Sequence, residues 1–248
     1  MSQPISFEDV VFKYHPLSKP LQLNVAFAQG KVTAIVGLSG SGKSTLLQLI
    51  NGLLRPDKGM IRVLGNPINY SRLQDLRRKI GYVAQGAGLF PHLTIEKNIG
   101  LASKIIGETL SNERVDELMD RMGLPHEYRQ RHPYQLSGGE QQRAVICMAL
   151  YARPPVVLMD ESMGSLDAIT RIEIQDQLLQ LQDHEKCTIV LVTHDMQEAL
   201  HLGDQLMVLN AGIVEAFGSP QDVQSSKSEL IQKLFASAAG TRTKTGRL

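Results

Sequence analysis

The stretch that decides the fold is Val32-Thr33-Ala34-Ile35-Val36, followed directly by Gly37-Leu38-Ser39-Gly40-Ser41-Gly42-Lys43-Ser44. Its first five residues form a continuous apolar and β-branched run, which is typical of a strand buried on both faces. The loop that follows matches the pattern G-x-x-x-x-G-K-[ST] at every fixed position. The apolar side of a helix comes next and stops at Arg55-Pro56; it is marked by Leu46, Leu47, Leu49, Ile50, Leu53 and Leu54.

The chemistry of this loop predicts phosphate binding. Its glycines let backbone N–H groups converge on phosphate oxygens, and the start of the helix adds partial positive charge. Lys43 is suited to reach β- and γ-phosphates, and the Ser44 hydroxyl to ligate Mg²⁺. A dinucleotide fingerprint is excluded, because it needs Gly or Ala where Thr45 stands after Gly40 and Gly42. The alternative is a Gly/Ser turn that happens to contain a lysine.

A second buried strand, Val156-Val157-Leu158-Met159, ends in the acidic pair Asp160-Glu161. Asp160 stands where a carboxylate holds Mg²⁺, directly or through water. Glu161 comes one position later, where its carboxylate can polarise a water for in-line attack on the γ-phosphate. The alternative is that the two acids simply begin a helix.

The remaining pattern predicts an α/β fold with a mixed sheet. Alternation over residues 5–10 and 21–27 indicates two half-exposed antiparallel strands, and a hairpin is expected over 205–216. Strands alternating with helical pattern predict a parallel core flanked by helices, as in P-loop NTPases. Residues 89–152 read as a helical subdomain inserted into one domain spanning 1–224. A short helical stretch and a flexible tail are expected over 225–248.

Composition excludes several classes of protein. The 248 residues contain 26 Lys and Arg against 25 Asp and Glu, so no global field recruits nucleic acid. The apolar runs fall short of the ~20 residues that a membrane helix needs, and no secretory signal is evident. Cys147 and Cys187 lack metal-ligand spacing and are expected to be buried thiols.

A third motif is Leu136-Ser137-Gly138-Gly139-Glu140-Gln141-Gln142-Arg143, within which a helix begins. Ser137 and the amides of Gly138 and Gly139 would form a second phosphate cradle. Together, the three motifs resemble the signature of ATP-binding cassette (ABC) ATPases, over about Ile5 to Asp222. The resemblance implies a head-to-tail dimer with a second copy or a paralogous cassette. Each ATP, with its Mg²⁺, would lie between the first loop of one chain and the second loop of the other.

The resemblance also assigns roles to single residues. Tyr14 stands where the family stacks an aromatic ring on adenine, although ordinary packing would also explain it. Gln85 resembles the mobile glutamine whose amide reaches Mg²⁺. Asp167 matches the loop that crosses the dimer interface, a role compatible with a helix N-cap. His194 resembles the switch histidine that contacts the γ-phosphate and holds Glu161 and the attacking water. The ATP-contacting loop itself would comprise Gly37, Leu38, Ser39, Gly40, Ser41, Gly42, Lys43, Ser44 and Thr45.

The sequence departs from the family pattern at three places, of which Glu140 and Ser162-Met163 bear on the turnover rate. Glu140 replaces the commoner Gln, and Gly164-Ser165 replaces a common Gly-Ala. Ser162-Met163 stands where importers usually have Pro-Phe, which makes the turn after Glu161 less rigid, since proline fixes φ.

The segment from Ile80 to Thr94 resembles importer cassettes, particularly those for osmoprotectants such as glycine betaine and other quaternary amines. The resemblance implies a peripheral subunit at the cytoplasmic face of the cell membrane, with a solute-binding protein as an indirect partner. Leu89, Phe90 and His92 are expected to contact transmembrane permease subunits, unless they turn inward. The alternatives are an amino-acid importer ATPase or a soluble ABC ATP switch; Ser137-Gly138-Gly139 excludes a metabolic P-loop kinase.

Overall fold

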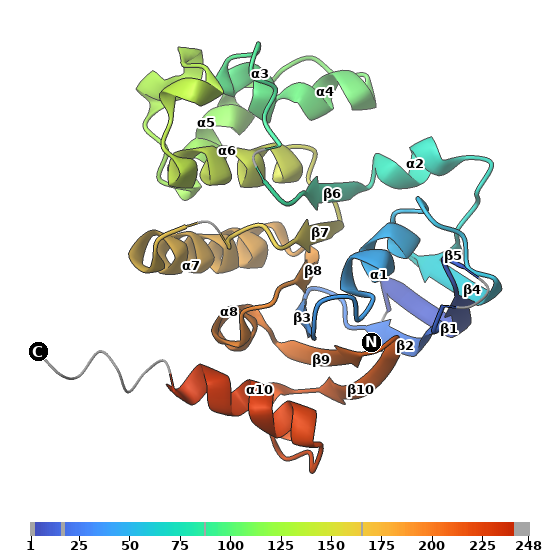
Figure 1. The fold of residues 1–248 in the computed structure, drawn as a ribbon. Coiled ribbons are helices and arrows are strands. Elements are labelled where there is room, and N and C mark those ends of the chain that lie inside the picture. The colour runs from blue at the N-terminus through green and yellow to red at the C-terminus, as the bar shows by residue number, and fades with distance from the viewer. Residues whose placement is uncertain (1–2, 16–17, 87, 165, 241–248) are drawn as a thin grey trace, which may run out of the picture. The chain divides into compact units, whose positions relative to one another are not determined.

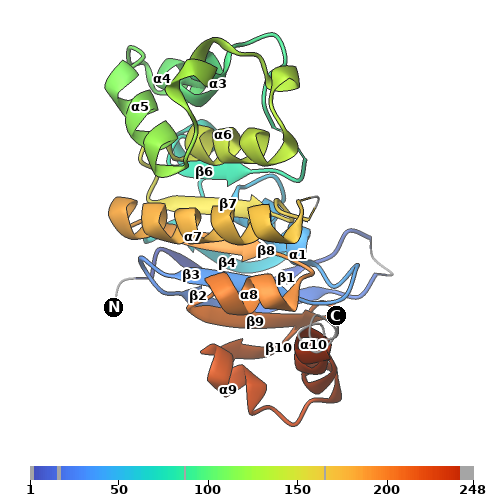
Figure 2. The same cartoon turned by 90° about the vertical axis from the view of Figure 1, so that its left-hand side faces the viewer.

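The computed structural model describes residues 3–15, 18–86, 88–164 and 166–240 of the chain. Two compact units form, unit 1 from residues 1–73 and 190–248 and unit 2 from residues 74–189. Figures 1 and 2 show the elements of each unit. The tail predicted beyond Gly240 lies outside the described residues.

Unit 1 holds the antiparallel strands predicted at the start of the chain and the hairpin predicted near its end. Its elements are β1 (Ile5–Phe12), β2 (Leu21–Phe27), β3 (Val32–Val36), α1 (Lys43–Ile50), β4 (Lys58–Val63), β5 (Asn66–Pro67), α8 (Met196–Leu202), β9 (Gln205–Asn210), β10 (Ile213–Gly218), α9 (Pro220–Gln224) and α10 (Glu229–Gly240). Strand β8 (Thr188–Val192) begins in unit 2 and ends in unit 1.

The sheet of unit 1 is mixed, as predicted. Its strand order is β5-β4-β1-β2-β10-β9-β3-β8. β1 pairs antiparallel with β2 and β4, and β9 pairs antiparallel with β10, whereas β3 is parallel to β9. Strand β3 is buried at every position, because neighbours cover it and both faces are packed.

The prediction that the first strand is half-exposed is wrong for its beginning. Ile5, Ser6 and Phe7 are all buried, so both faces of β1 are covered at its start, while β2 and β4 pair with its two edges. A bulge then shifts the register before Val10, with Asp9 in the left-handed region at φ 48°. Alternation along one strand cannot reveal such a bulge.

The C-terminal helix α10 belongs to the core of unit 1. Ile231 is fully buried in a cluster with Met196 of α8 and with Val36 of β3. The Gln197 side-chain amide on α8 also donates to the carbonyl of Ala238 at 2.9 Å. Helix α10 therefore packs against α8, and Figure 2 shows both helices.

Unit 2 contains two strands and most of the helices. Its elements are α2 (Leu73–Arg77, which starts at the division), β6 (Ile80–Val83), α3 (Ile95–Ile99), α4 (Leu101–Ile106), α5 (Asn112–Arg121), the 3₁₀ turns His126–Gln130 and Pro133–Gln135, α6 (Gly138–Leu150), β7 (Val156–Asp160) and α7 (Ala168–Glu185). β6 and β7 are parallel.

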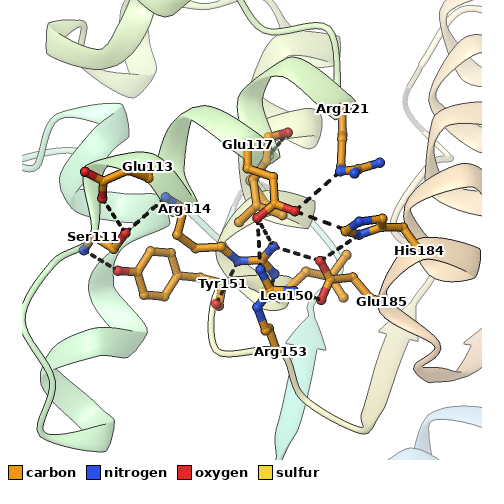
Figure 3. A network of polar contacts seen from close by, with 12 residues as sticks. Ser111, Glu113, Arg114, Glu117, Arg121, Leu150, Tyr151, Arg153, His184 and Glu185 are labelled. Atoms are coloured by element: carbon orange, nitrogen blue, oxygen red, sulfur yellow. Dashed lines mark hydrogen bonds and ion pairs between the residues drawn. The ribbon is translucent and has the colours of Figure 1, made fainter.

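A buried arginine joins three helices of unit 2 (Figure 3). Arg114 of α5 donates to the carbonyls of Leu150 and Tyr151 at the end of α6, at 2.8 and 3.2 Å. The same guanidinium pairs with Glu117 of α5 and Glu185 of α7, at 2.8 and 2.7 Å. Because every partner is an acceptor, the buried charge is compensated.

Two further expectations concern the whole chain. Both cysteines are free and buried, as predicted, and burial raises the pKa of each thiol to about 12. Among the described residues, no helix has the length and apolar character needed to cross a membrane.

Candidate functional site

The glycine-rich loop of unit 1 joins β3 to α1, as the sequence predicts. A Cβ on Gly37 would lie 2.0 Å from the carbonyl oxygen of Leu209 on β9, so only glycine fits there. Gly42 has φ 107° and is the N-cap of α1, where no described side chain supplies a cap hydrogen bond. The helix therefore presents backbone N–H groups at the loop, which suits an anion.

Lys43 is held across this loop. Its ammonium donates to the carbonyls of Gly37 at 2.9 Å and Leu38 at 3.2 Å, and the residue is 7% exposed. The positive charge is thus fixed at the glycine loop by the loop's own backbone.

Tyr14 lies beside α1 and remains 66% exposed. Its hydroxyl donates to the Gln48 side-chain oxygen at 3.0 Å and accepts from the Thr45 hydroxyl at 3.3 Å. The ring contacts Phe12 edge-on, with centroids 5.0 Å apart. A pocket of about 370 Å³ adjoins it, lined by Val11, Lys13, Tyr14, His15, Asp57 and Lys58. An exposed ring beside a pocket suits a flat ligand, and the adenine role stays a prediction.

His194 follows β8 in unit 1, and the residues on either side of it are fixed. The Thr193 amide donates to the carbonyl of Ile35 on β3 at 3.1 Å, and the Thr193 hydroxyl donates to the buried carboxylate of Glu198. Asp195 caps α8 by accepting from the Gln197 amide at 2.8 Å. The exposed imidazole thus sits on a rigid turn. Sequence reasoning missed Thr193 and Glu198, although the T-H-D-x-x-E spacing was visible.

The acidic pair lies in unit 2 at the end of β7. Asp160 and Glu161 are half-buried, and Glu161 has φ 43°, in the left-handed region. The alternative that the two acids begin a helix is wrong, because the next helix starts at Ala168. Burial, and secondarily the Asp160 carboxylate, raises the pKa of Tyr82 on the neighbouring strand β6. The sequence gives no signal for the left-handed Glu161.

The third motif, residues 136–143, also lies in unit 2, where Ser137 is the N-cap of α6. Its hydroxyl accepts from the Glu140 amide at 3.3 Å, and its own amide donates to the Glu140 carboxylate at 2.7 Å. This bond from the Ser137 backbone lowers the pKa of Glu140. The departure at Glu140 therefore completes a capping box, which a glutamine would do without the charge.

The two glycines of this motif differ in their surroundings. A Cβ on Gly139 would lie 2.6 Å from the Thr170 methyl carbon on α7, whereas a Cβ on Gly138 would meet no atom within 4 Å. Gly139 is thus needed for packing of α6 against α7. Gly138 is exposed and has no steric need within the chain.

Asp167 and Gln85 complete the predicted residues of unit 2. Asp167 is the N-cap of α7, accepting from the amides of Ile169 and Thr170 at 3.2 and 3.0 Å, so the N-cap interpretation is confirmed. A hydrogen bond from the Thr170 side chain, and secondarily the one from the Thr170 amide, hold the pKa of Asp167 below its usual range. Gln85 is exposed in the segment after β6. Ala87 and Ser165 lie outside the described residues.

The residues predicted for the site belong to both units. Unit 1 carries the glycine loop, Tyr14 and His194, and unit 2 carries Gln85, Asp160, Glu161, Ser137 and Asp167. Within each unit, helix starts and strand ends hold these side chains. The roles that require both units stay predictions.

The curated proteins that this chain matches include transport ATP-binding proteins. The choline transport ATP-binding protein OpuBA of Bacillus subtilis (strain 168) is 44% identical over 203 residues, 81% of this chain and 53% of the relative. The glycine betaine/carnitine/choline transport ATP-binding protein OpuCA of the same strain is 43% identical over 216 residues, 86% and 57% of the two chains. The chain thus spans little more than half the length of these relatives.

A solved structure and a family model agree with these relatives. The ATP-binding cassette MJ0796, a dimer bound to ADP and Pi, superposes with a TM-score of 0.74 at 32% identity, covering 87% of this chain and 98% of that one. The family model described as ABC transporter matches residues 21–164. This chain belongs to the ABC transporter family.

Proposed function

We propose that the chain is an ATP-binding and ATP-hydrolysing subunit that energises solute import through a membrane ABC transporter. The observation that carries this proposal is the glycine loop of residues 37–44, in which the Lys43 ammonium is held by the carbonyls of Gly37 and Leu38. The matched relatives are named as transport ATP-binding proteins.

The residues present suit MgATP. Ser44, Gln85 and Asp160 offer hydroxyl, amide and carboxylate oxygens, the ligand type that Mg²⁺ prefers. When bound, the ion would neutralise charge on the β- and γ-phosphates. The loop amides and Lys43 would bind the phosphate oxygens, and Tyr14 would stack on adenine.

Hydrolysis would follow from Glu161 and His194. The Glu161 carboxylate would accept a proton from a water whose oxygen attacks the γ-phosphorus in line. The bond from that phosphorus to the bridging oxygen breaks, and ADP and phosphate leave. His194, exposed on its rigid turn, would hold the water and the γ-phosphate in position.

The functional form would be an ATP-sandwich dimer with a second copy or a paralogous cassette. Each chain has one glycine loop and one Ser137 motif, and the open space at Gly138 leaves room for a phosphate from outside the chain. The cassette MJ0796 provides a dimeric precedent.

A surface for the permease subunits is proposed at the segment after Gln85. Leu89 is 8% exposed and anchors the segment inward, whereas Phe90 is 44% exposed and His92 is exposed. Leu89 thus packs inward, whereas Phe90 is exposed and could contact a permease subunit. Phe90 would meet an apolar side of a permease helix at the cytoplasmic face of the membrane, and a solute-binding protein would join the complex indirectly.

The proposed cargo is an osmoprotectant, a quaternary amine. The names of the two relatives support this class, since choline, carnitine and glycine betaine are all quaternary amines. Uptake assays with radiolabelled choline and with an amino acid as competitor would separate this cargo from that of an amino-acid importer.

The deciding experiment compares Glu161→Gln and Lys43→Ala in the reconstituted transporter. Glu161→Gln should bind ATP, dimerise in gel filtration and hydrolyse roughly 10²-fold more slowly or worse, because only the proton acceptor is lost. Lys43→Ala should instead weaken ATP binding. Glu127→Gln, at an exposed glutamate, serves as the control. Wild-type turnover in Glu161→Gln would show that the base is wrongly assigned.

A further inference from the structure

The segment that displays Phe90 is organised around one buried side chain, Asn98 of α3. Asn98 is 0% exposed, although it is a polar residue in a helix of five residues. Its position between the buried apolar residues Ile95 and Ile99 would suit a hydrophobic side chain equally well. A polar residue there calls for an explanation by its partners.

All the partners of the Asn98 side chain belong to the loop of residues 90–94. The amide oxygen accepts from the Phe90 N–H at 2.6 Å. The amide nitrogen lies 3.1 Å from the Phe90 carbonyl, 3.1 Å from the Leu93 carbonyl and 3.0 Å from the Thr94 carbonyl. Its two N–H groups are therefore shared among three acceptors, and both polar groups of the Phe90 backbone are bound by one side chain.

Other contacts complete the loop. The Leu93 amide donates to the Phe90 carbonyl at 3.1 Å, and Thr94 caps α3 by accepting from the Lys97 amide. The Phe90 and His92 rings meet edge-on, with centroids 6.0 Å apart. Since Pro91 restricts φ, the loop has few alternative conformations once Asn98 has bound its backbone.

We propose that Asn98 is a positioning residue: it fixes the 90–94 loop in advance, so that Phe90 is presented to the permease without an ordering step at binding. This inference rests on the docking role proposed above for Phe90. Fixing a loop in its bound conformation removes the entropy loss that binding would otherwise incur. The Phe90 side chain then supplies the contact, and Asn98 supplies its orientation.

Aspartate, leucine and alanine would not bind the loop backbone in the same way at position 98. Aspartate keeps the acceptor for the Phe90 amide but cannot donate to three carbonyls, and it adds a buried charge. Leucine or alanine would leave the Phe90 N–H and the three carbonyls without this partner. Asn98→Asp and Asn98→Ala are therefore the informative variants.

The first test measures amide hydrogen exchange of the full chain. The Phe90 N–H should be protected in the wild type, and Asn98→Ala should accelerate its exchange about tenfold or more, because one hydrogen bond is lost. Asn66→Ala, which also removes a side-chain amide bonded to a loop carbonyl, should leave that exchange unchanged. Exchange of the wild-type Phe90 N–H at the rate of an unstructured peptide would overturn the proposal, whether or not the variants fold.

The second test is a double-mutant cycle with Phe90→Ala. The readouts are association with the permease subunits, purified with the tagged wild-type chain, and the basal ATPase of the free chain. Asn98→Ala and Phe90→Ala should each weaken association about tenfold, and the double variant should be no weaker than the single ones. Basal ATPase should stay within about twofold throughout, whereas a purely structural role would lower it in Asn98→Ala.

The outcomes separate the two proposals. Normal association of Phe90→Ala would refute the docking role itself. Weak association of Phe90→Ala combined with normal or additive behaviour of Asn98→Ala would refute the positioning role alone. Asn98→Asp repeats the cycle with a variant that keeps the shape of the side chain.

Discussion

Because the backbone at Glu161 is left-handed, we predict that glycine is more stable than alanine at this position, the reverse of the order at ordinary backbone conformations. For any residue with a Cβ, this conformation costs about 1–2 kcal/mol, and glycine escapes that cost. Glycine loses about 0.5–1 kcal/mol more than alanine through its unfolded-state freedom. At φ 43°, Glu161→Gly should therefore unfold with a free energy about 0.5–1 kcal/mol above that of Glu161→Ala.

Comparing glycine with alanine isolates the backbone, because both variants lack the carboxylate and all its interactions. The assay is urea titration of the nucleotide-free chain, with equal slopes required of the two variants, or a melting point that differs by about 1–4 °C. The same pair at Gln180, an exposed position inside α7, is the control. There glycine should be less stable than alanine by about 1 kcal/mol. An alanine variant at 161 that is as stable as the glycine variant, or more stable, would refute the argument.

Three further predictions concern the third motif, residues 136–143, and the core of unit 2. The pKa of Glu140 is lowered in the folded chain, so the charged carboxylate stabilises the fold. The wild type should therefore be more stable than Glu140→Gln by about 0.5 kcal/mol above pH 4.5, and this difference should vanish as the pH falls through the lowered pKa. Urea titration at several pH values measures it. Gly139→Ala should lower the free energy of unfolding by about 1–3 kcal/mol, and Thr170→Ser should restore it. Gly138→Ala, in open space within α6, should leave that free energy unchanged or raise it by up to about 1 kcal/mol; thermal melts decide. With a thiol pKa of about 12, Cys147 should react with a disulfide reagent at pH 8 only upon unfolding, and rapid labelling of the folded chain would contradict its burial.

Local pattern predicted the elements that carry the motifs. The β-branched run before Gly37 is β3, and the hairpin around Gly212 is β9 with β10. The sequence does not predict strand β4, because its alternation of buried and exposed residues begins only after Gly59. Gly59 has φ 81° and lies opposite the bulge in β1. A Cβ on Gly59 would lie 2.4 Å from the Asp9 carbonyl oxygen, so the feature becomes visible only when the two strands pair.

For the candidate site, too, local features were predictable from the sequence and features that depend on tertiary contacts were not. Local pattern placed Lys43 and Ser137 at helix starts, and the N-cap alternative for Asp167 is correct, because capping is a local interaction. The support of His194 by Thr193 and Glu198, and the attachment of Phe90 to Asn98, involve buried side-chain bonds that periodicity does not encode. The left-handed Glu161 depends on the surrounding packing in unit 2.

The close approach of Gly37 to the Leu209 carbonyl means that the glycine loop depends on a strand far along the chain. The segment matched by the family model, residues 21–164, holds the glycine loop but ends before β9. Strand β9, whose Leu209 carbonyl approaches Gly37, and helix α10, which packs in the same core, both follow the loop in the chain and are translated after it. A nascent chain on the ribosome would therefore expose an unformed nucleotide loop until β9 emerges, and nucleotide binding should appear only after that point.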